Sequence, residues 1–395
     1  MNTTLSQSLK VGNATNIRST ILLGLYFILV FFLTRHVPFT KYAVLMNVAL
    51  IGLFILAFKE VFNGIFRLHK SDQLLLLAVV SYLLIDVFYS LMMQAEPGLI
   101  FRFLLILLLI ALAYFIMLPK KIIGIFLWLN VIQAVFVTLL ALGLVLFFSP
   151  KEALMVRFFF LDQNWGDVYS LNGWLYKVQI KGNGLLPVAF FLTYLYRIKR
   201  VLLIRGILFA GCVFAGNFAF LISIGLFSFM FFLKAKSVDT LFRKIFLVVI
   251  CLLFFSYPVY TYYVKDVLES KQQGSLGTRY DQARVLMDDL TEDPVTTIFG
   301  QGIGHTVEVI TPYRDYRGKI FYELQTLYIL NQLGILGFTI FILYNLRLII
   351  INYKKSGLLL LYLCYVLYSI TNPYIFDSGH IAVILLLNSL SNYET

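Results

Sequence analysis

Charge is scarce in this sequence. Only 13% of the 395 residues are charged, whereas 60% are hydrophobic and the mean hydropathy is +0.86. A water-soluble domain carries about 25% charged residues, so a soluble fold would leave too much apolar surface facing water. The apolar residues also occur in long blocks, as the hydrocarbon core of a bilayer requires. The composition therefore predicts an integral membrane protein whose partner is the lipid bilayer.

Cysteine and histidine are scarce as well. All three cysteines lie inside apolar blocks, which argues against a disulfide framework. The histidines His36, His69 and His380 are scattered and lack the spacing of metal ligands. The sequence GQGIG at 300–304 lacks the βαβ context of a dinucleotide-binding turn. We therefore expect no bound metal and no cofactor.

The apolar blocks predict an all-α polytopic membrane protein of about twelve spanning helices, with a single transmembrane domain over residues 1–395. A spanning helix needs roughly 20 apolar residues. The block 201–233 is too long for one span, and Gly216 and Asn217 offer a break between two short helices. The predicted helices are 19–33, 42–58, 73–93, 99–118, 122–148, 184–196, 201–215, 218–233, 245–263, 324–346, 357–370 and 380–390.

The basic residues predict the orientation. The net charge of +12 could suggest nucleic acid, but Lys and Arg fall between the apolar blocks rather than along a soluble surface. Polytopic proteins keep such residues on the cytoplasmic side. With the N-terminus inside, the inward segments hold eighteen Lys and Arg residues and the short outward loops hold three. This distribution predicts cytoplasmic termini and no nucleic-acid partner.

Two long segments then face outward, at 149–182 and 264–322. The first is rich in Phe, Trp and Tyr, which suits a segment that lies against lipid headgroups. The second is polar and contains a helix signal, because Thr278 is a candidate cap for a helix over 279–289 and Pro294 follows its end. The GQGIG sequence then predicts a tight turn. We expect a large, partly helical outer loop between the ninth and tenth helices.

Candidate site residues gather in this outer loop. Arginine binds phosphate oxygens bidentately and keeps its charge, so clustered arginines suit phosphate or pyrophosphate. Glu323, where the chain re-enters the membrane, is a candidate general base or arginine partner, and His305 is a further catalytic candidate. The alternative is that these are solvated charges paired with nearby aspartates. The loop arginines in question are Arg279, Arg284, Arg314 and Arg317.

Three charged positions elsewhere also suggest function. Lys177 and Lys181, at the outer start of the sixth helix, suit either membrane anchoring or substrate binding. Asp86 lies within the third helix, where ionisable residues are costly. Its depth favours a structural pair with Arg102, whereas a proton relay would indicate a transporter.

The outer-loop residues occur in a familiar order. The run TRYDQARVLMDDLTEDPVTTIFGQGIG from Thr278 gives an arginine, a short amphipathic helix, a proline and a glycine turn. The run YELQTLYILNQLGILG from Tyr322 then gives a polar residue that opens a helix containing Gly334 and Gly337. This order, with the predicted topology, resembles the O-antigen polymerase and ligase superfamily of bacterial envelope membrane glycosyltransferases.

The resemblance implies a multi-pass protein of the bacterial inner membrane that uses no metal. Members transfer glycans at the outer face from undecaprenyl-pyrophosphate-linked oligosaccharides. In the polymerase, a sugar hydroxyl of an incoming repeat displaces undecaprenyl pyrophosphate from the growing chain. By resemblance, Arg279 holds the pyrophosphate, with Arg284, Arg314 and Arg317 as helpers. A chain-length-regulating co-polymerase is an implied partner.

Two differences from the ligase pattern bear on whether this chain resembles a ligase or a polymerase. Ligases open the helix after the large loop with histidine, whereas this chain has Glu323 there, which favours the polymerase. Ligases also carry a Ser-Arg pair between the short middle helices, where this chain reads AGNFAF at 215–220. The positive charge that the arginine of this pair supplies in ligases would then come from Arg157, Lys177 or Lys181. The alternatives are a ligase that transfers glycan to lipid A-core and a lipid-linked oligosaccharide flippase, which needs a charged central cavity.

Overall fold

A computed structural model describes residues 2–42, 44–170, 176–233, 277–311, 315–317, 322–353 and 356–393. The described chain is mostly helical, with one small sheet. Its helices are α1 (Asn2–Thr34), α2 (His36–Phe39), η1 (Thr40–Tyr42), α3 (Val44–Leu56), α4 (Phe58–Arg67), α5 (Lys70–Met92), α6 (Pro97–Ala113), α7 (Lys121–Phe147), α8 (Pro150–Asp162), η2 (Asn183–Leu185), α9 (Leu186–Leu195), α10 (Val201–Phe214), α11 (Phe218–Leu233), α14 (Gly277–Leu290), α15 (Pro294–Phe299), α16 (Gln325–Asn352), α17 (Ser356–Ser369) and α18 (Ser378–Tyr393).

Several of these helices suit a bilayer by length and composition. Within the described ranges, five are long and apolar enough to cross it: Ile17–Thr34, Val37–Leu56, Lys70–Met92, Lys121–Phe147 and Gln325–Asn352. The other apolar helices, including α6, α10 and α18, have 10–17 residues. The molecule is therefore a helical membrane protein, as its composition predicts. The predicted ninth helix, 245–263, lies outside the described residues.

Local breaks divide some predicted helices. The predicted break after α10 is confirmed, because Gly216 has a φ of +63° and separates α10 from α11. The helix predicted over 42–58 corresponds to α3, which ends two residues earlier at Leu56, and a separate helix, α4, begins at Phe58. Ala57 between them has a φ of −92° and a ψ of 8°.

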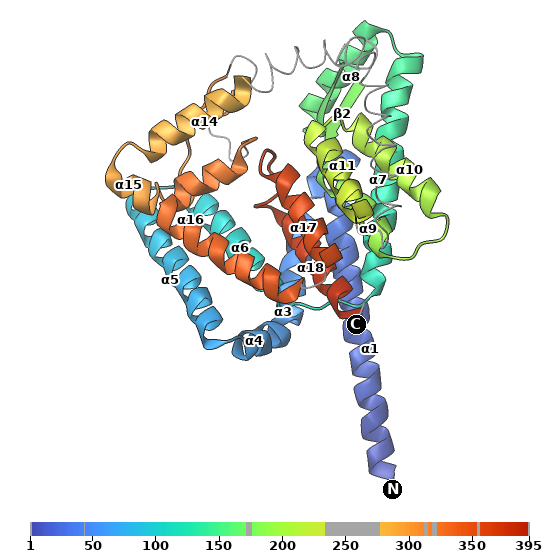
Figure 1. Cartoon of the computed structure of the whole chain (residues 1–395), viewed down its shortest axis with the longest axis vertical. Coiled ribbons are helices and arrows are strands. Elements are labelled where there is room, and N and C mark those ends of the chain that lie inside the picture. The colour runs from blue at the N-terminus through green and yellow to red at the C-terminus, as the bar shows by residue number, and fades with distance from the viewer. Residues whose placement is uncertain are drawn as a thin grey trace.

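The segment 149–182, predicted to face outward, contains regular structure that the sequence did not predict. Ser149 caps α8 with a capping box to Glu152. After α8, strands β1 (Gly166–Ser170) and β2 (Tyr176–Ile180) pair antiparallel, with Gly166 opposite Ile180. In Figure 1 this hairpin and α8 lie beside the upper end of α7, whereas the N- and C-termini lie toward the opposite end.

The helices form two groups on either side of α1, α17 and α18. On one side α5 packs against α6 and α16, and α14 and α15 pack against α16. On the other side α7 packs against α9 and α10 (Figure 1). Buried tyrosines tie neighbouring helices together through hydroxyl hydrogen bonds to carbonyls, from Tyr26 of α1 to Ala382 of α18 at 3.2 Å and from Tyr344 of α16 to Ala111 of α6 at 2.9 Å. A buried hydroxyl without such a partner would be costly.

A kink in α16 positions the chain that follows α15. Gly334 has a φ of +61° and a ψ of 178°, which interrupts the helical hydrogen-bond ladder. The released carbonyls accept other donors: Asn331 accepts from the Gln301 N–H at 2.9 Å and Gln332 accepts from the Gly302 N–H at 3.0 Å. The kink therefore fixes the chain that follows α15 against the middle of α16.

The GQGIG turn is the segment that docks there, as a tight turn in agreement with the sequence. Gly300, Gly302 and Gly304 have φ values of +86°, +93° and +88°, a region that L side chains rarely adopt. A Cβ on Gly300 would lie 2.1 Å from the Gln332 carbonyl oxygen, and one on Gly334 would lie 2.3 Å from the Gly300 nitrogen. Only glycine permits this backbone contact.

Candidate functional site

Arg279 and Glu323, two of the predicted catalytic residues, lie together at the start of α14 and just before α16. The Arg279 Nε lies 3.1 Å from the Glu323 Oε2, and their side chains are 26% and 24% exposed. The Nε–H is not aligned for a hydrogen bond. Gln282, one turn along α14, accepts a hydrogen bond from the Leu324 N–H at 3.3 Å and fixes the chain beside the pair. The result is a charged contact that solvent can reach.

His305 supports the glycine turn. Its Nε2 lies 3.1 Å from the Asp289 Oδ2, and the Asn331 amide donates to the same oxygen at 2.7 Å. Burial favours a higher pKa for Asp289, but the hydrogen bonds from His305 and Asn331 outweigh it and lower the pKa. The His305 carbonyl accepts from the Tyr328 hydroxyl at 2.5 Å. These contacts account for His305 structurally, so its catalytic role stays a prediction.

The other predicted loop arginines lie at the surface or outside the described chain. Arg284 lies 3.9 Å from Asp288 one turn along α14, with side chains 70% and 74% exposed. Arg317 lies 2.6 Å from Asp315, and both are about half exposed. Exposed pairs of this kind contribute little to stability, because water and salt screen the attraction between the charges. Arg314 lies outside the described residues.

Two predicted cations of the first outward segment hold the hairpin. Arg157 of α8 donates two hydrogen bonds to Asp167 of β1, at 2.8 and 3.1 Å. The charged ends of Arg157 and Lys177 lie 5.4 and 5.3 Å from the centre of the Tyr169 ring. Lys177 is buried, and its carbon chain covers Gly216. Both cations therefore have structural contacts beside their predicted binding role.

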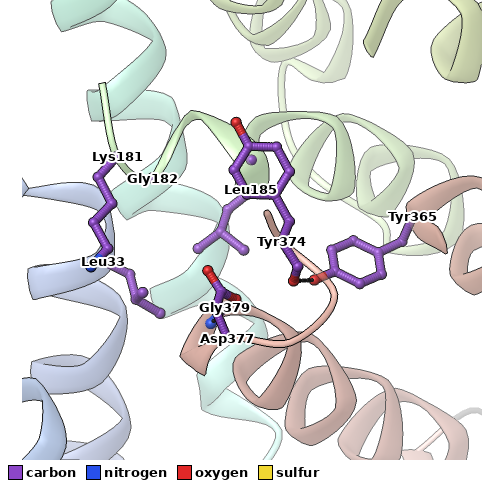
Figure 2. A pocket seen from close by; sticks show the side chains of 9 residues that line it. Leu33, Lys181, Gly182, Leu185, Tyr365, Tyr374, Asp377 and Gly379 are labelled. Atoms are coloured by element: carbon purple, nitrogen blue, oxygen red, sulfur yellow. Dashed lines mark hydrogen bonds between the residues drawn. The ribbon is translucent and has the colours of Figure 1, made fainter. Parts of the chain in front are cut away.

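Lys181 has a different setting, because it lines a pocket with the linker between α17 and α18. The pocket, of about 30 Å³, is bounded by Leu33 of α1, Lys181, Leu185, Tyr374 and Asp377 among others (Figure 2). That volume holds small polar groups or waters. The pocket lies where three elements distant in sequence meet.

Two opposite charges, Lys181 and Asp377, line this small and mostly apolar pocket. The Lys181 side chain keeps solvent contact at the wall, yet the surrounding protein lowers the pKa of Lys181 through desolvation, which Asp377 opposes and Arg102 reinforces. Desolvation raises the pKa of Asp377 to about 6, which Lys181 and the N–H groups of His380 and Gly379 oppose. Among the described residues, Lys181 and Asp377 form no direct ion pair, so the space between them separates opposite charges.

Asp377 is a candidate that the sequence reasoning missed. Its Oδ1 accepts hydrogen bonds from the backbone N–H groups of Gly379 at 2.8 Å and His380 at 3.1 Å, which caps α18. The residues Asp377-Ser378-Gly379 resemble an ordinary helix start, so the only available signal pointed to structure. Packing alone places Asp377 opposite Lys181.

The predicted pair between Asp86 and Arg102 is wrong. The Asp86 carboxylate accepts a hydrogen bond from the Ile303 backbone, and its Oδ2 has no hydrogen-bond partner. Arg102 instead lies within electrostatic range of Lys181. Asp86 therefore anchors the glycine turn to α5, because Ile303 is the fourth residue of that turn.

The described residues offer charged side chains rather than a metal centre. Among the described residues, no group of three His, Cys, Asp or Glu could hold a metal ion. A scan against protein-family models and a search of curated proteins found no match for the chain. Its function is therefore argued from the two charged features above: the pair of Arg279 with Glu323, and the pocket between Lys181 and Asp377.

Proposed function

We propose that this protein polymerises undecaprenyl-pyrophosphate-linked oligosaccharide repeats into O-antigen or a related polysaccharide. The observation that carries the proposal is the solvent-accessible contact of Arg279 with Glu323. The two residues come from separate runs of the sequence, and both belong to the order of residues that resembles the polymerase and ligase superfamily. Their meeting supports a shared role in one site.

Under this proposal Arg279 binds the pyrophosphate of the growing chain. A guanidinium next to a low-dielectric surface stabilises the charge that develops as a phosphate leaves. The Arg279 side chain is 26% exposed, so a phosphate can approach it, whereas its Nε is buried and makes no hydrogen bond in the described chain. Glu323 orients the guanidinium before the substrate binds. No metal takes part.

We further propose the topology that the charge distribution predicts. About twelve helices span the bacterial inner membrane, including 245–263 and the shorter apolar helices. Both termini then lie in the cytoplasm, and residues 264–322 form the large periplasmic loop. The placement of both termini at one end of the molecule supports this topology (Figure 1). A co-polymerase that regulates chain length is the proposed protein partner.

Deletion of the gene, followed by electrophoresis of the surface glycan, tests the function. Core that carries a single repeat is the expected result, because a polymerase mutant still transfers unpolymerised repeats. Bare core would instead indicate the ligase or the flippase. A full ladder in the deletion strain would contradict all three assignments.

A further inference from the structure

A polymerase needs a second subsite, for the sugar hydroxyl that attacks. Such a subsite requires a space that a hydroxyl group can enter and an acceptor for the hydroxyl proton. The pocket between Lys181 and Asp377 meets both requirements. It is separate from the contact of Arg279 with Glu323, in which an oxygen of the glutamate is already in contact with the arginine.

The Asp377 carboxylate has one oxygen available. Oδ1 is used by the backbone of α18, whereas Oδ2 accepts no hydrogen bond within the described chain. Figure 2 shows this carboxylate between Lys181, Leu185 and Tyr374. Lys181 likewise makes no hydrogen bond or ion pair among the described residues. An incoming hydroxyl could therefore donate to Oδ2 without breaking an existing contact.

Tyr374 connects the pocket to the proposed pyrophosphate site. Both Asp377 and Glu323 act on Tyr374 electrostatically, so the two carboxylates lie near the same side chain. A nucleophile at Asp377 and a leaving group at Arg279 must lie on either side of one anomeric carbon. Because Tyr374 lines the pocket and lies within electrostatic range of both carboxylates, the pocket and the proposed pyrophosphate site are close in space.

We propose that the pocket receives the acceptor sugar hydroxyl and that Asp377 is its general base, an inference that rests on the proposed function. The hydroxyl oxygen forms a bond to the anomeric carbon of the growing chain, and its proton passes to Oδ2 of Asp377. The bond between the anomeric carbon and the phosphate oxygen breaks, and undecaprenyl pyrophosphate leaves with the electron pair. Asp377 then releases the proton to solvent. Lys181 positions the hydroxyl from the opposite wall.

The groups around Asp377 agree with this role. Lys181 faces it from the linker after β2, Tyr365 and Tyr368 from α17, and Tyr374 from its own linker. Desolvation raises the pKa of Asp377 to about 6, and Lys181 and the N–H groups of His380 and Gly379 oppose the rise. A base with this pKa is mostly ionised at neutral pH and loses its function as the pH falls through 6.

A capping role alone is the competing explanation, and Asp377→Asn separates the two. Asparagine caps helices as well as aspartate does, but it cannot take up the proton. The assay uses the full-length protein in detergent with purified undecaprenyl-pyrophosphate-linked repeats. We expect an unchanged apparent unfolding temperature and a loss of kcat of about 10²-fold or more. The matched control is Asp288→Asn, an exposed carboxylate on α14, which we expect to keep wild-type kcat.

Wild-type kcat in Asp377→Asn would overturn the inference while leaving the proposed function intact. No chain growth by the wild-type protein, together with a full ladder in the deletion strain, would overturn both. If Asp377→Asn does not fold, Lys181→Met provides the test. Loss of the ammonium removes a charge that lowers the pKa of Asp377, so the acid limb of kcat/KM moves to higher pH. An unmoved limb would overturn the inference.

Discussion

At the scale of single residues, Arg279 and Arg284 differ in their contacts although both belong to α14. Arg279 contacts Glu323, just before α16, whereas Arg284 among the described residues contacts its helical neighbour Asp288, with both side chains in solvent. A cation held across two elements can be aimed at a ligand, and a cation on a flexible exposed chain cannot. Arg279 and Arg284, two arginines of one helix, therefore provide a matched comparison.

We expect Arg279→Ala to abolish chain growth and Arg284→Ala to cause a much smaller loss. The reason is that only Arg279 is fixed beside the proposed leaving group. The glycan ladder on a gel measures activity, and immunoblotting of membranes measures the amount of each variant that inserts. Equal ladders from the two variants at equal protein levels would remove Arg279 from the site.

At the scale of elements, the contact between the glycine turn and the kink of α16 makes a stability prediction. Gly334→Ala places a Cβ 2.3 Å from the Gly300 nitrogen at a φ of +61°. We expect a destabilisation of about 1–3 kcal/mol from backbone strain, with more from the clash. The apparent unfolding temperature in detergent measures it.

Gly124→Ala in α7 is the control for this change. A Cβ at Gly124 meets nothing within 4 Å, and alanine is favoured over glycine in a helix by about 1 kcal/mol. We therefore expect an unfolding temperature equal to or above that of the wild type. If Gly124→Ala lowered the unfolding temperature as much as Gly334→Ala, the loss could not be assigned to the contact between Gly334 and Gly300.

Sequence reasoning succeeded for elements whose cause is local. The break at Gly216 and the GQGIG turn follow from residues inside those segments, and both are present. The kink at Gly334 was not predicted, because its backbone depends on a turn that precedes it by about 30 residues. The hairpin over 166–180 was missed for a similar reason, since aromatic residues suit both a membrane interface and a strand.

At the scale of the whole molecule, the topology is the main prediction. We expect Glu292→Cys, in the exposed turn between α14 and α15, to react with a membrane-impermeant thiol reagent in spheroplasts. Lys199→Cys, in the exposed turn between α9 and α10, is expected to react only after the membrane is opened. The described native cysteines, Cys212 and Cys364, are buried and add little background. The reverse pattern would contradict the orientation.

The candidate site also shows what only the whole molecule determines. Arg279 was chosen from the sequence because a guanidinium suits phosphate, and Glu323 because a carboxylate at that point is a candidate base or arginine partner. Asp377 could not be chosen in this way, because its importance depends on Lys181 and Leu33, which lie in distant parts of the chain. Residue type predicts which chemistry is available, whereas tertiary packing decides which groups face one another.

The docked glycine turn has a practical consequence for protein engineering. Backbone hydrogen bonds from residues 301 and 302 to residues 331 and 332 close the base of the intervening loop, so its length can change without moving α15 or α16. Each doubling of loop length costs only about 0.6 kcal/mol in closure entropy. An epitope tag inserted beside the exposed Arg317 would thus give a handle for purification. Fusion at this position leaves both ends of the chain unaltered.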